Sequence, residues 1–363
     1  MAATQRSEPA SEPPLASRRH ALSRLVASLL IAAALGWMLA RGGLPIVPGH
    51  DAFAHLEPWT VPAYLGTLVA VHTLRAIRWR HLLRPLGNVP LRSVVSIAWI
   101  GFAAILFLPL RMGEFVRPYL MGKRSTVRGW SAAGTVAGER VLDGLILSLV
   151  LFGALNATET LDPLPERVGD LAVPVAIVPR AAYAALVLFA SALLVLLLFR
   201  RHRSASIRLV SATVGKLSRP WARGIEGIFE RLARGLDFLP SPQRTVPFVG
   251  ESLLYWASNA VGLWLLAQGT GLEAIGLPEA CVIMGVLGVG ILIPSGPGYF
   301  GTFQLSIYMA LAMFVPPEQV AREGSAFVFI AYCCQLGQHA LGGAIGAAFT
   351  WPAKLRPRNK VAS

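Results

Sequence analysis

Five ionisable side chains lie in apolar stretches of the sequence, where a charge is costly. They are Arg111, Glu114, Glu139, Arg140 and Asp143. A charge at the centre of a bilayer costs about 2.5–3.5 kcal/mol on insertion scales, so these groups must face the protein interior and pair. On a helix, Arg140 and Asp143 are three residues apart, and Glu139 and Asp143 are four apart. The three side chains therefore form one cluster on one helix face.

Two interpretations of this cluster are open, and they can coexist. In the structural interpretation, the charges only clamp neighbouring helices together. In the functional one, which we favour, Arg111 and Arg140 bind an anionic group while the acids balance or relay charge. Arginine suits phosphate because its planar guanidinium donates two hydrogen bonds at once. The cluster therefore predicts a site for a phosphate-containing ligand.

The composition indicates that the elements around this cluster are membrane helices. Of the 363 residues, 54% are hydrophobic and only 14% are charged, whereas about a quarter of a soluble domain is charged. Most of the net charge of +14 lies in alternate loops, the positive-inside pattern of membrane proteins, which disfavours nucleic acid as a partner. Six apolar runs, most of them near bilayer-spanning length, are Leu25–Ala40, Val61–Leu74, Val136–Leu155, Ala181–Phe199, Leu253–Ala267 and Phe327–Thr350.

Two further apolar segments are interrupted by proline and glycine. Ser93–Leu108 is followed by Pro109, which removes a helix donor, and by Gly113, which permits a sharp reversal. Leu277–Ile293 is followed by a second break, formed by Pro294, Gly296, Pro297, Gly298 and Gly301. Broken backbone at this depth is tolerated only where it is buried or lines a cavity. The loop charges favour two re-entrant hairpins that enter the membrane from opposite faces.

The sequence therefore predicts an all-α polytopic membrane protein with about six spanning helices and two re-entrant broken hairpins. Hairpins of opposite entry are typical of an inverted repeat that builds its substrate site from the broken helices. We expect residues 1–20 to be a disordered N-terminus and 21–352 to be a single membrane domain. Residues 200–246 are expected to form a cytoplasmic amphipathic segment, and 353–363 a basic tail. The charges place both termini in the cytoplasm, with the chain in the cytoplasmic (inner) membrane.

The second half of the chain offers milder polar residues. Ser295 and Gln304 flank the second break and are candidate substrate-binding residues. A single membrane histidine such as His339 more often packs or forms hydrogen bonds than binds a ligand. The three cysteines lie in apolar runs and are expected to be packing residues, neither bridged nor bound to metal. No nucleophile–base set, metal-ligand set or phosphate-binding loop appears, so we expect no cofactor and no enzymatic activity.

Several short motifs together resemble a known family. They are Arg78-Trp79-Arg80, the run from Pro109 to Glu114 with Arg117, Glu139-Arg140-x-x-Asp143, and Pro294…Gly298…Gly301. In this order they resemble the flippase-like membrane domain of the lysylphosphatidylglycerol synthase family, over roughly residues 20–350. The resemblance implies lipid translocation or another role in envelope lipid biology, and it adds Arg117 to the candidates. The family's soluble aminoacyl-transfer domain is not expected here, and Gln304 stands where the family has a glutamate.

We therefore predict a flippase or transporter for a lipid with an anionic headgroup, such as a phospholipid or a polyprenyl phosphate. Its expected substrate-binding residues are Arg111, Glu114, Arg117, Glu139, Arg140, Asp143, Ser295 and Gln304. Two other classes stay open. One is a non-transporting accessory protein of envelope lipid or glycan synthesis, and the other is a membrane enzyme acting on lipid-linked substrates.

Overall fold

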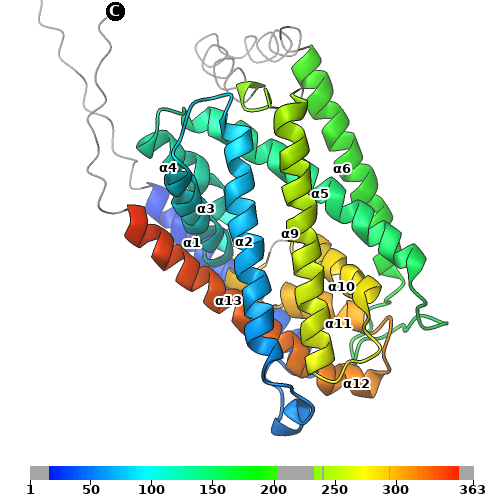
Figure 1. Cartoon of the computed structure of the whole chain (residues 1–363). Coiled ribbons are helices and arrows are strands. Elements are labelled where there is room, and N and C mark those ends of the chain that lie inside the picture. Colours follow the sequence, from blue (N-terminus) through cyan, green and yellow to red (C-terminus); the bar gives the residue numbers. More distant parts are fainter. Residues whose placement is uncertain (1–15, 203, 205–232, 239–240, 294, 351–363) are drawn as a thin grey trace, which may run out of the picture.

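The computed structural model describes residues 16–202, 204, 233–238, 241–293 and 295–350, although the side chains of residues 16–22, 24 and 109–111 lie outside the described part. All regular elements in these ranges are helical, which confirms the predicted all-α class (Figure 1). The α-helices are α1 (Ala16–Arg41), α2 (Thr60–Leu83), α3 (Leu91–Phe107), α4 (Val116–Arg124), α5 (Gly129–Ala157), α6 (Ile177–Arg201), α9 (Pro242–Gly269), α10 (Leu277–Gly290), α11 (Thr302–Leu311), α12 (Pro317–Ala321) and α13 (Glu323–Thr350). Short 3-10 helices are η1 (His50–Phe53), η2 (Pro109–Phe115) and η3 (Pro297–Tyr299).

Six of these helices, α1, α2, α5, α6, α9 and α13, have 24 to 29 residues. At about 1.5 Å per residue, each exceeds the roughly 30 Å of a bilayer's hydrocarbon core. Two of them, α5 and α6, are both long and apolar enough to cross a membrane. On α6, Leu188, Leu194 and Val195 are more than half exposed. Such an apolar outer face is expected where lipid is the solvent.

Several helix boundaries differ from those expected. α1 begins at Ala16, five residues before the expected start of the membrane domain at residue 21. α6 continues to Arg201 and α9 already begins at Pro242, while most of the expected amphipathic segment 200–246 lies outside the described residues, as do 1–15 and 353–363. α2 continues to Leu83, nine residues beyond the end of the apolar run at Leu74.

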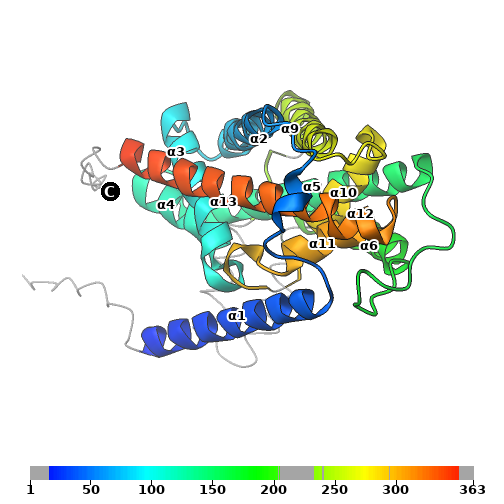
Figure 2. The ribbon, with the colours of Figure 1, turned by 90° about the horizontal axis from the view of Figure 1, so that it is seen from below.

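The buried apolar side chains form two separate clusters, and the long helices α2, α5 and α9 contribute to both. On α2, Leu68 belongs to one cluster and Ala76 to the other, with the buried His72 between them. On α5, Val136 and Leu147 likewise lie in different clusters. α2 and α9 run side by side, and α1 lies along another face of the bundle (Figures 1 and 2).

Polar side chains gather where the two apolar clusters adjoin. We call them the polar layer, and its members are His72, Arg75, Arg78, Glu139, Arg140, Asp143, Ser252 and His339. They come from α2, α5, α9 and α13. Polar groups in such a place are costly unless they pair, so the layer is the first place to look for function.

The first break separates α3 from α4. α3 ends at Phe107, and Leu108 takes an extended conformation because the following Pro109 disfavours helix at the residue before it. η2 then folds back onto α3. A Cβ at Gly113 would collide with the backbone of Ala104 and Ile105 on α3. The two segments can therefore approach this closely only because residue 113 is a glycine.

Gly113→Ala is expected to lower the free energy of unfolding by about 1–3 kcal/mol, because backbone atoms cannot move aside cheaply. Gly66→Ala on α2 is the matched control, since a Cβ there meets nothing within 4 Å. Thermal unfolding of both variants in detergent measures the difference. Equal melting temperatures for the two variants would contradict the close approach of η2 to α3.

The second break follows α10 and contains three residues with positive φ: Gly298 (73°), Tyr299 (56°) and Gly301 (87°). Left-handed backbone is uncommon for a residue such as tyrosine. α1 packs on this break, where the Ser28 hydroxyl donates to the Ser295 carbonyl at 3.2 Å. η3 also lies against α3, and η2 lies against both α1 and α3. The two breaks are thus covered by the same pair of helices.

Candidate functional site

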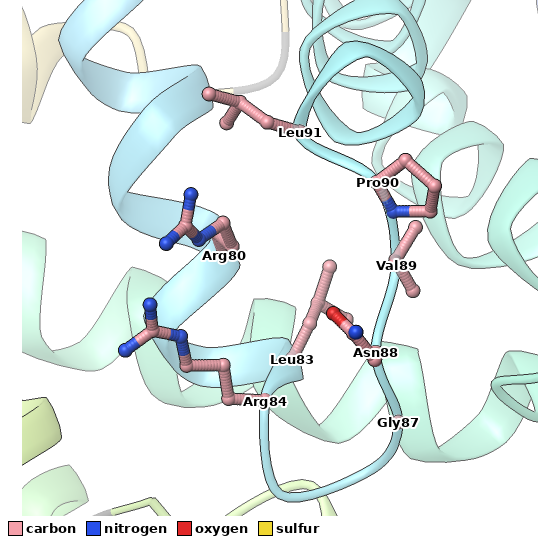
Figure 3. Close-up of a pocket in the computed structure, with 8 residues that line it drawn as sticks. All are labelled: Arg80, Leu83, Arg84, Gly87, Asn88, Val89, Pro90 and Leu91. Atoms are coloured by element: carbon pink, nitrogen blue, oxygen red, sulfur yellow. The ribbon is translucent and has the colours of Figure 1, made fainter.

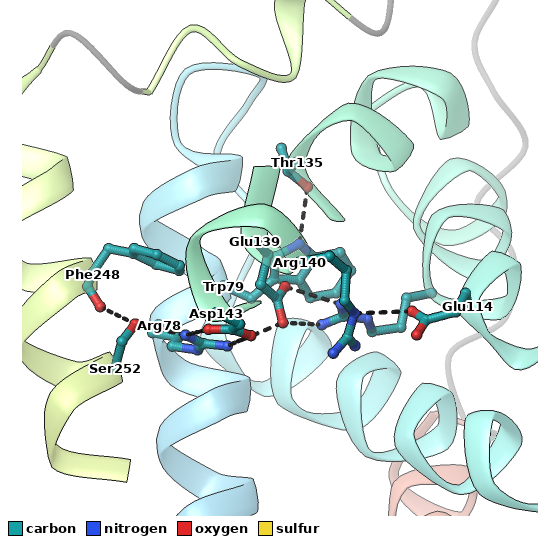
Figure 4. Close-up of polar contacts among 10 residues, drawn as sticks. Arg78, Trp79, Glu114, Thr135, Glu139, Arg140, Asp143, Phe248 and Ser252 are labelled. Carbon is teal, nitrogen blue, oxygen red and sulfur yellow. Dashed lines mark hydrogen bonds and ion pairs between the residues drawn. The ribbon is translucent and has the colours of Figure 1, made fainter. Parts of the chain in front are cut away.

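Glu139 lies at the centre of the buried charges and binds two arginines from different helices. Arg117 of α4 donates from Nη2 to Glu139 Oε2 at 3.0 Å, and Arg78 of α2 donates from Nη2 to Oε1 at 3.3 Å (Figure 4). All three residues are fully buried. One carboxylate therefore joins α2, α4 and α5.

Asp143, one helical turn further along α5, pairs with Arg78 in a two-pronged contact. Arg78 Nη1 and Nη2 donate to Asp143 Oδ1 and Oδ2, each at 2.6 Å. Arg78 Nη1 also donates to the Ser252 hydroxyl of α9 at 2.6 Å. Ser252 in turn donates to the Phe248 carbonyl (Figure 4). This fork geometry is the strongest way to hold an arginine beside a carboxylate.

Aromatic rings enclose both of these guanidinium groups. Arg78 lies 4.5 Å from the ring centre of Tyr255, and Arg117 lies 4.9 Å from that of Trp79. Gly101 of α3 leaves room for the stem of Arg117, which a Cβ would fill. We call Arg78, Arg117, Glu139 and Asp143 the charge clamp. Its geometry matches the structural interpretation of the cluster, in which buried charges hold helices together.

Two further arginines next to the clamp are paired less completely. Arg140 donates from Nε to Glu114 Oε2 at 3.2 Å, and both side chains keep a fifth to a third of their surface exposed. Its buried Nη2 has no hydrogen-bond partner among the described residues. In Figure 4 this guanidinium points away from the centre of the clamp. Arg140 can therefore donate to a further acceptor.

Arg75, one turn before Arg78 on α2, has even fewer polar contacts. It is partly buried, and its guanidinium lies over the rings of Phe102, at 4.5 Å, and Tyr255, at 5.8 Å. Within the described part of the chain it forms no hydrogen bond or ion pair, and its Nε is buried without a partner. Arg75 and Arg140 lie within electrostatic reach of each other. Each of the two keeps a buried donor without a partner among the described residues.

The candidates near the second break have local partners. Gln304 Oε1 accepts a hydrogen bond from the Gly301 backbone N–H at 2.8 Å, so its side chain stabilises the start of α11. Ser295 is buried beneath α1 through its backbone contact with Ser28. No contact joins Ser295 or Gln304 to the described arginines. The side chain of Arg111 and all of Pro294 lie outside the described residues.

Comparison with known proteins places this architecture in a family. The sequence model of the lysylphosphatidylglycerol synthase TM region matches residues 24–328. The chain belongs to this family. Membership and the apolar helices together identify an integral membrane protein of the lysylphosphatidylglycerol synthase TM family.

One similar curated protein is glycosyltransferase AglD from Haloferax volcanii, which is 28% identical over 292 residues. The matched region covers 74% of this chain but 46% of that relative, so this lysylphosphatidylglycerol synthase TM chain spans about half of the relative's length. No solved structure matches.

Two residues of the polar layer, Arg75 and Arg78, were not among the site residues predicted from the sequence. Arg75 and Arg78 were expected at the cytoplasmic end of the second helix, but α2 continues past them and Arg78 is fully buried. Part of the signal was present in the acids, because two buried carboxylates, Glu139 and Asp143, require more than the one buried cation that Arg117 supplies. The spacing of three between Arg75 and Arg78 also places them on one helix face.

A pocket of about 210 Å³ lies apart from the polar layer, at the C-terminal end of α2 (Figure 3). Arg80 and Arg84, on successive turns of α2, line one side, and Asn88 and Pro90 of the following loop line the other. Neither arginine has an ion-pair partner in the part of the chain that the structure describes. This end of α2 is therefore strongly basic.

Proposed function

We propose that this protein moves a lipid with an anionic phosphate headgroup across the membrane. The observation that carries the proposal is the pair Arg75 and Arg140, whose guanidinium groups keep free donors in the polar layer. An unpaired arginine in a membrane segment is costly and by default marks a ligand site. In this proposal the charge clamp positions α2 and α5, while Arg75, Arg140 and Arg111 hold the phosphate. Glu114 balances part of the positive charge of Arg140.

The proposed topology supports such a path. The six long helices span the cytoplasmic (inner) membrane, and the broken segments α3–η2–α4 and α10–η3–α11 enter it from opposite faces and return. Both breaks lie against α1 and α3, so a movement of these helices would change access to both at once. Broken helices that meet at mid-depth are a common way to build a transport site.

A second candidate function is transfer of a group to or from a lipid-linked substrate. It is favoured by the similarity to a protein named as a glycosyltransferase. A third candidate is an accessory role in lipid or glycan synthesis, without transport. Transport and group transfer would both use a lipid phosphate as ligand, so measurement of lipid movement and of product formation is needed to separate them.

The test is reconstitution in vesicles that contain acyl-chain-labelled phosphatidylglycerol or labelled polyprenyl phosphate, followed by chemical quenching of the outer leaflet. Arg140→Gln is expected to slow the movement of the label at least tenfold, because the variant loses one charge-assisted hydrogen bond to the headgroup. Arg124→Gln, an exposed arginine at the end of α4, is the matched control and should behave as the parent. Movement unchanged in Arg140→Gln would refute the site, and turnover of a lipid-linked sugar without movement would favour the enzyme.

A further inference from the structure

Two histidines from opposite ends of the chain meet in the polar layer. His72 Nε2 of α2 lies 3.1 Å from His339 Nε2 of α13, with the rings nearly perpendicular. The other ring nitrogens are also engaged: His72 Nδ1 lies 2.8 Å from the Leu68 carbonyl, and His339 Nδ1 lies 2.8 Å from the Gln335 carbonyl. Both histidines are more than nine-tenths buried.

When both rings are neutral, the pair has too few N–H donors for its close polar contacts. There are three close polar contacts, two from ring nitrogen to carbonyl and one between the ring nitrogens. A neutral imidazole carries one N–H, so two neutral rings supply two protons for three contacts. Whichever tautomers form, one contact is left with two facing lone pairs. A third proton satisfies all three contacts.

Burial and the charge around the pair together decide when that proton binds. Phe102 of α3 packs edge-on against His72, and the neutral Gln335 and Gln338 lie on His339's own helix. The charged group that acts on both rings is Arg75 of α2. Arg75 in turn lies near Tyr255 of α9 and within reach of Asp143 and Arg140 of α5. The positive charge of Arg75 opposes protonation of the histidines, and an anion bound to Arg75 offsets it.

We propose that His72 and His339 hold one exchangeable proton between them, and that an anionic headgroup at Arg75 promotes its uptake. The second clause rests on the proposed function. The proton comes from the aqueous phase and forms a new Nε2–H bond on one ring, which donates to Nε2 of the other. The negative charge of the bound headgroup balances the added positive charge. Anion binding and proton binding are thereby linked, because each makes the other more favourable.

A metal ion between the two rings is the competing explanation. Structural metal sites usually take four ligands and catalytic sites three. Among the described residues, no group of three or more histidine, cysteine and acidic side chains is placed to hold a metal. The geometry therefore favours a proton.

The experiment uses the full chain with ¹⁵N-labelled histidine, reconstituted in phosphatidylglycerol vesicles and, separately, in phosphatidylcholine vesicles. Nitrogen resonances recorded from pH 5 to pH 8 distinguish protonated from bare ring nitrogens. We expect one of the two bare Nε2 signals to disappear as the pH falls. The midpoint of this transition should lie roughly one pH unit higher in phosphatidylglycerol than in phosphatidylcholine, because the anionic headgroup adds a negative charge near the histidines.

Two variants and one control assign the signal. His72→Gln and His339→Gln should each abolish the transition, and His50→Gln, at an exposed position, should leave it intact. A pair that keeps two bare Nε2 atoms over the whole range in both vesicles would overturn the proposal. Equal midpoints in the two lipids would overturn the link to the anion, and a signal that changes on chelation would show a metal instead. Since the measurement needs no transport, a protonated pair in a chain that moves no lipid would refute the flippase alone.

Discussion

Glu139→Gln is expected to lower the free energy of unfolding by about 3–5 kcal/mol, among the largest effects of any single substitution in this chain. The change keeps the shape of the side chain but removes the charge that Arg78 and Arg117 share. Two fully buried guanidinium groups would then be left with the single carboxylate of Asp143. Removing one partner of a buried ion pair is strongly destabilising because the remaining charge stays buried without compensation. Thermal unfolding in detergent measures the loss.

A second substitution separates this charge effect from simple loss of packing. Adding Arg117→Met to Glu139→Gln removes the orphaned cation as well, so the double variant should recover much of the lost stability. Glu114→Gln is the matched control for an acid near the surface of the site. Its ion pair with Arg140 is partly exposed, and we expect about 1 kcal/mol or less. A Glu139→Gln protein that unfolds like the parent would show that the clamp does not depend on the charge of Glu139.

The sequence supports prediction of the helical class, of both broken segments and of the charged face of α5. These features are local. Proline and glycine interrupt a helix whatever surrounds them, as Pro109 and Gly113 do between α3 and α4. The i, i+4 spacing of Glu139 and Asp143 likewise places them on one face before any tertiary contact is known.

The partners of these groups could not be predicted in the same way, because they come from distant parts of the chain. Arg78 is 65 residues from Asp143 and 174 from Ser252. Its position among the arginines that end the second helix made it look cytoplasmic, since an apolar run that stops at Leu74 does not show how far the buried part of the helix extends. His339 looked like an isolated packing histidine for the same reason, because His72 lies 267 residues away. Only the packing of α2 against α5, α9 and α13 brings these side chains together.

Arg75→Met is expected to reduce lipid movement about tenfold to a hundredfold while leaving the protein at least as stable as the parent. Arg75 makes no ion pair within the described residues, so its removal leaves no acid unpaired and relieves the cost of a partly buried charge. In the proposed function it binds the headgroup phosphate, and loss of a charge-assisted contact costs about 1.5–3 kcal/mol. Arg75→Lys should fall between, because lysine keeps the charge but lacks the planar fork.

Opposite outcomes at two arginines one turn apart on α2 make this prediction sharp. Arg78→Met should destabilise the protein strongly, because Asp143 and Glu139 lose a cation that lies between them. Arg84→Met, an exposed arginine at the end of the same helix, should change neither stability nor movement. If Arg75→Met instead unfolds at a lower temperature and moves lipid normally, Arg75 is a structural residue and the phosphate site must lie elsewhere. If stability holds and movement is lost, the division of α2 into a clamping arginine and a binding arginine stands, because no purely structural role predicts that combination.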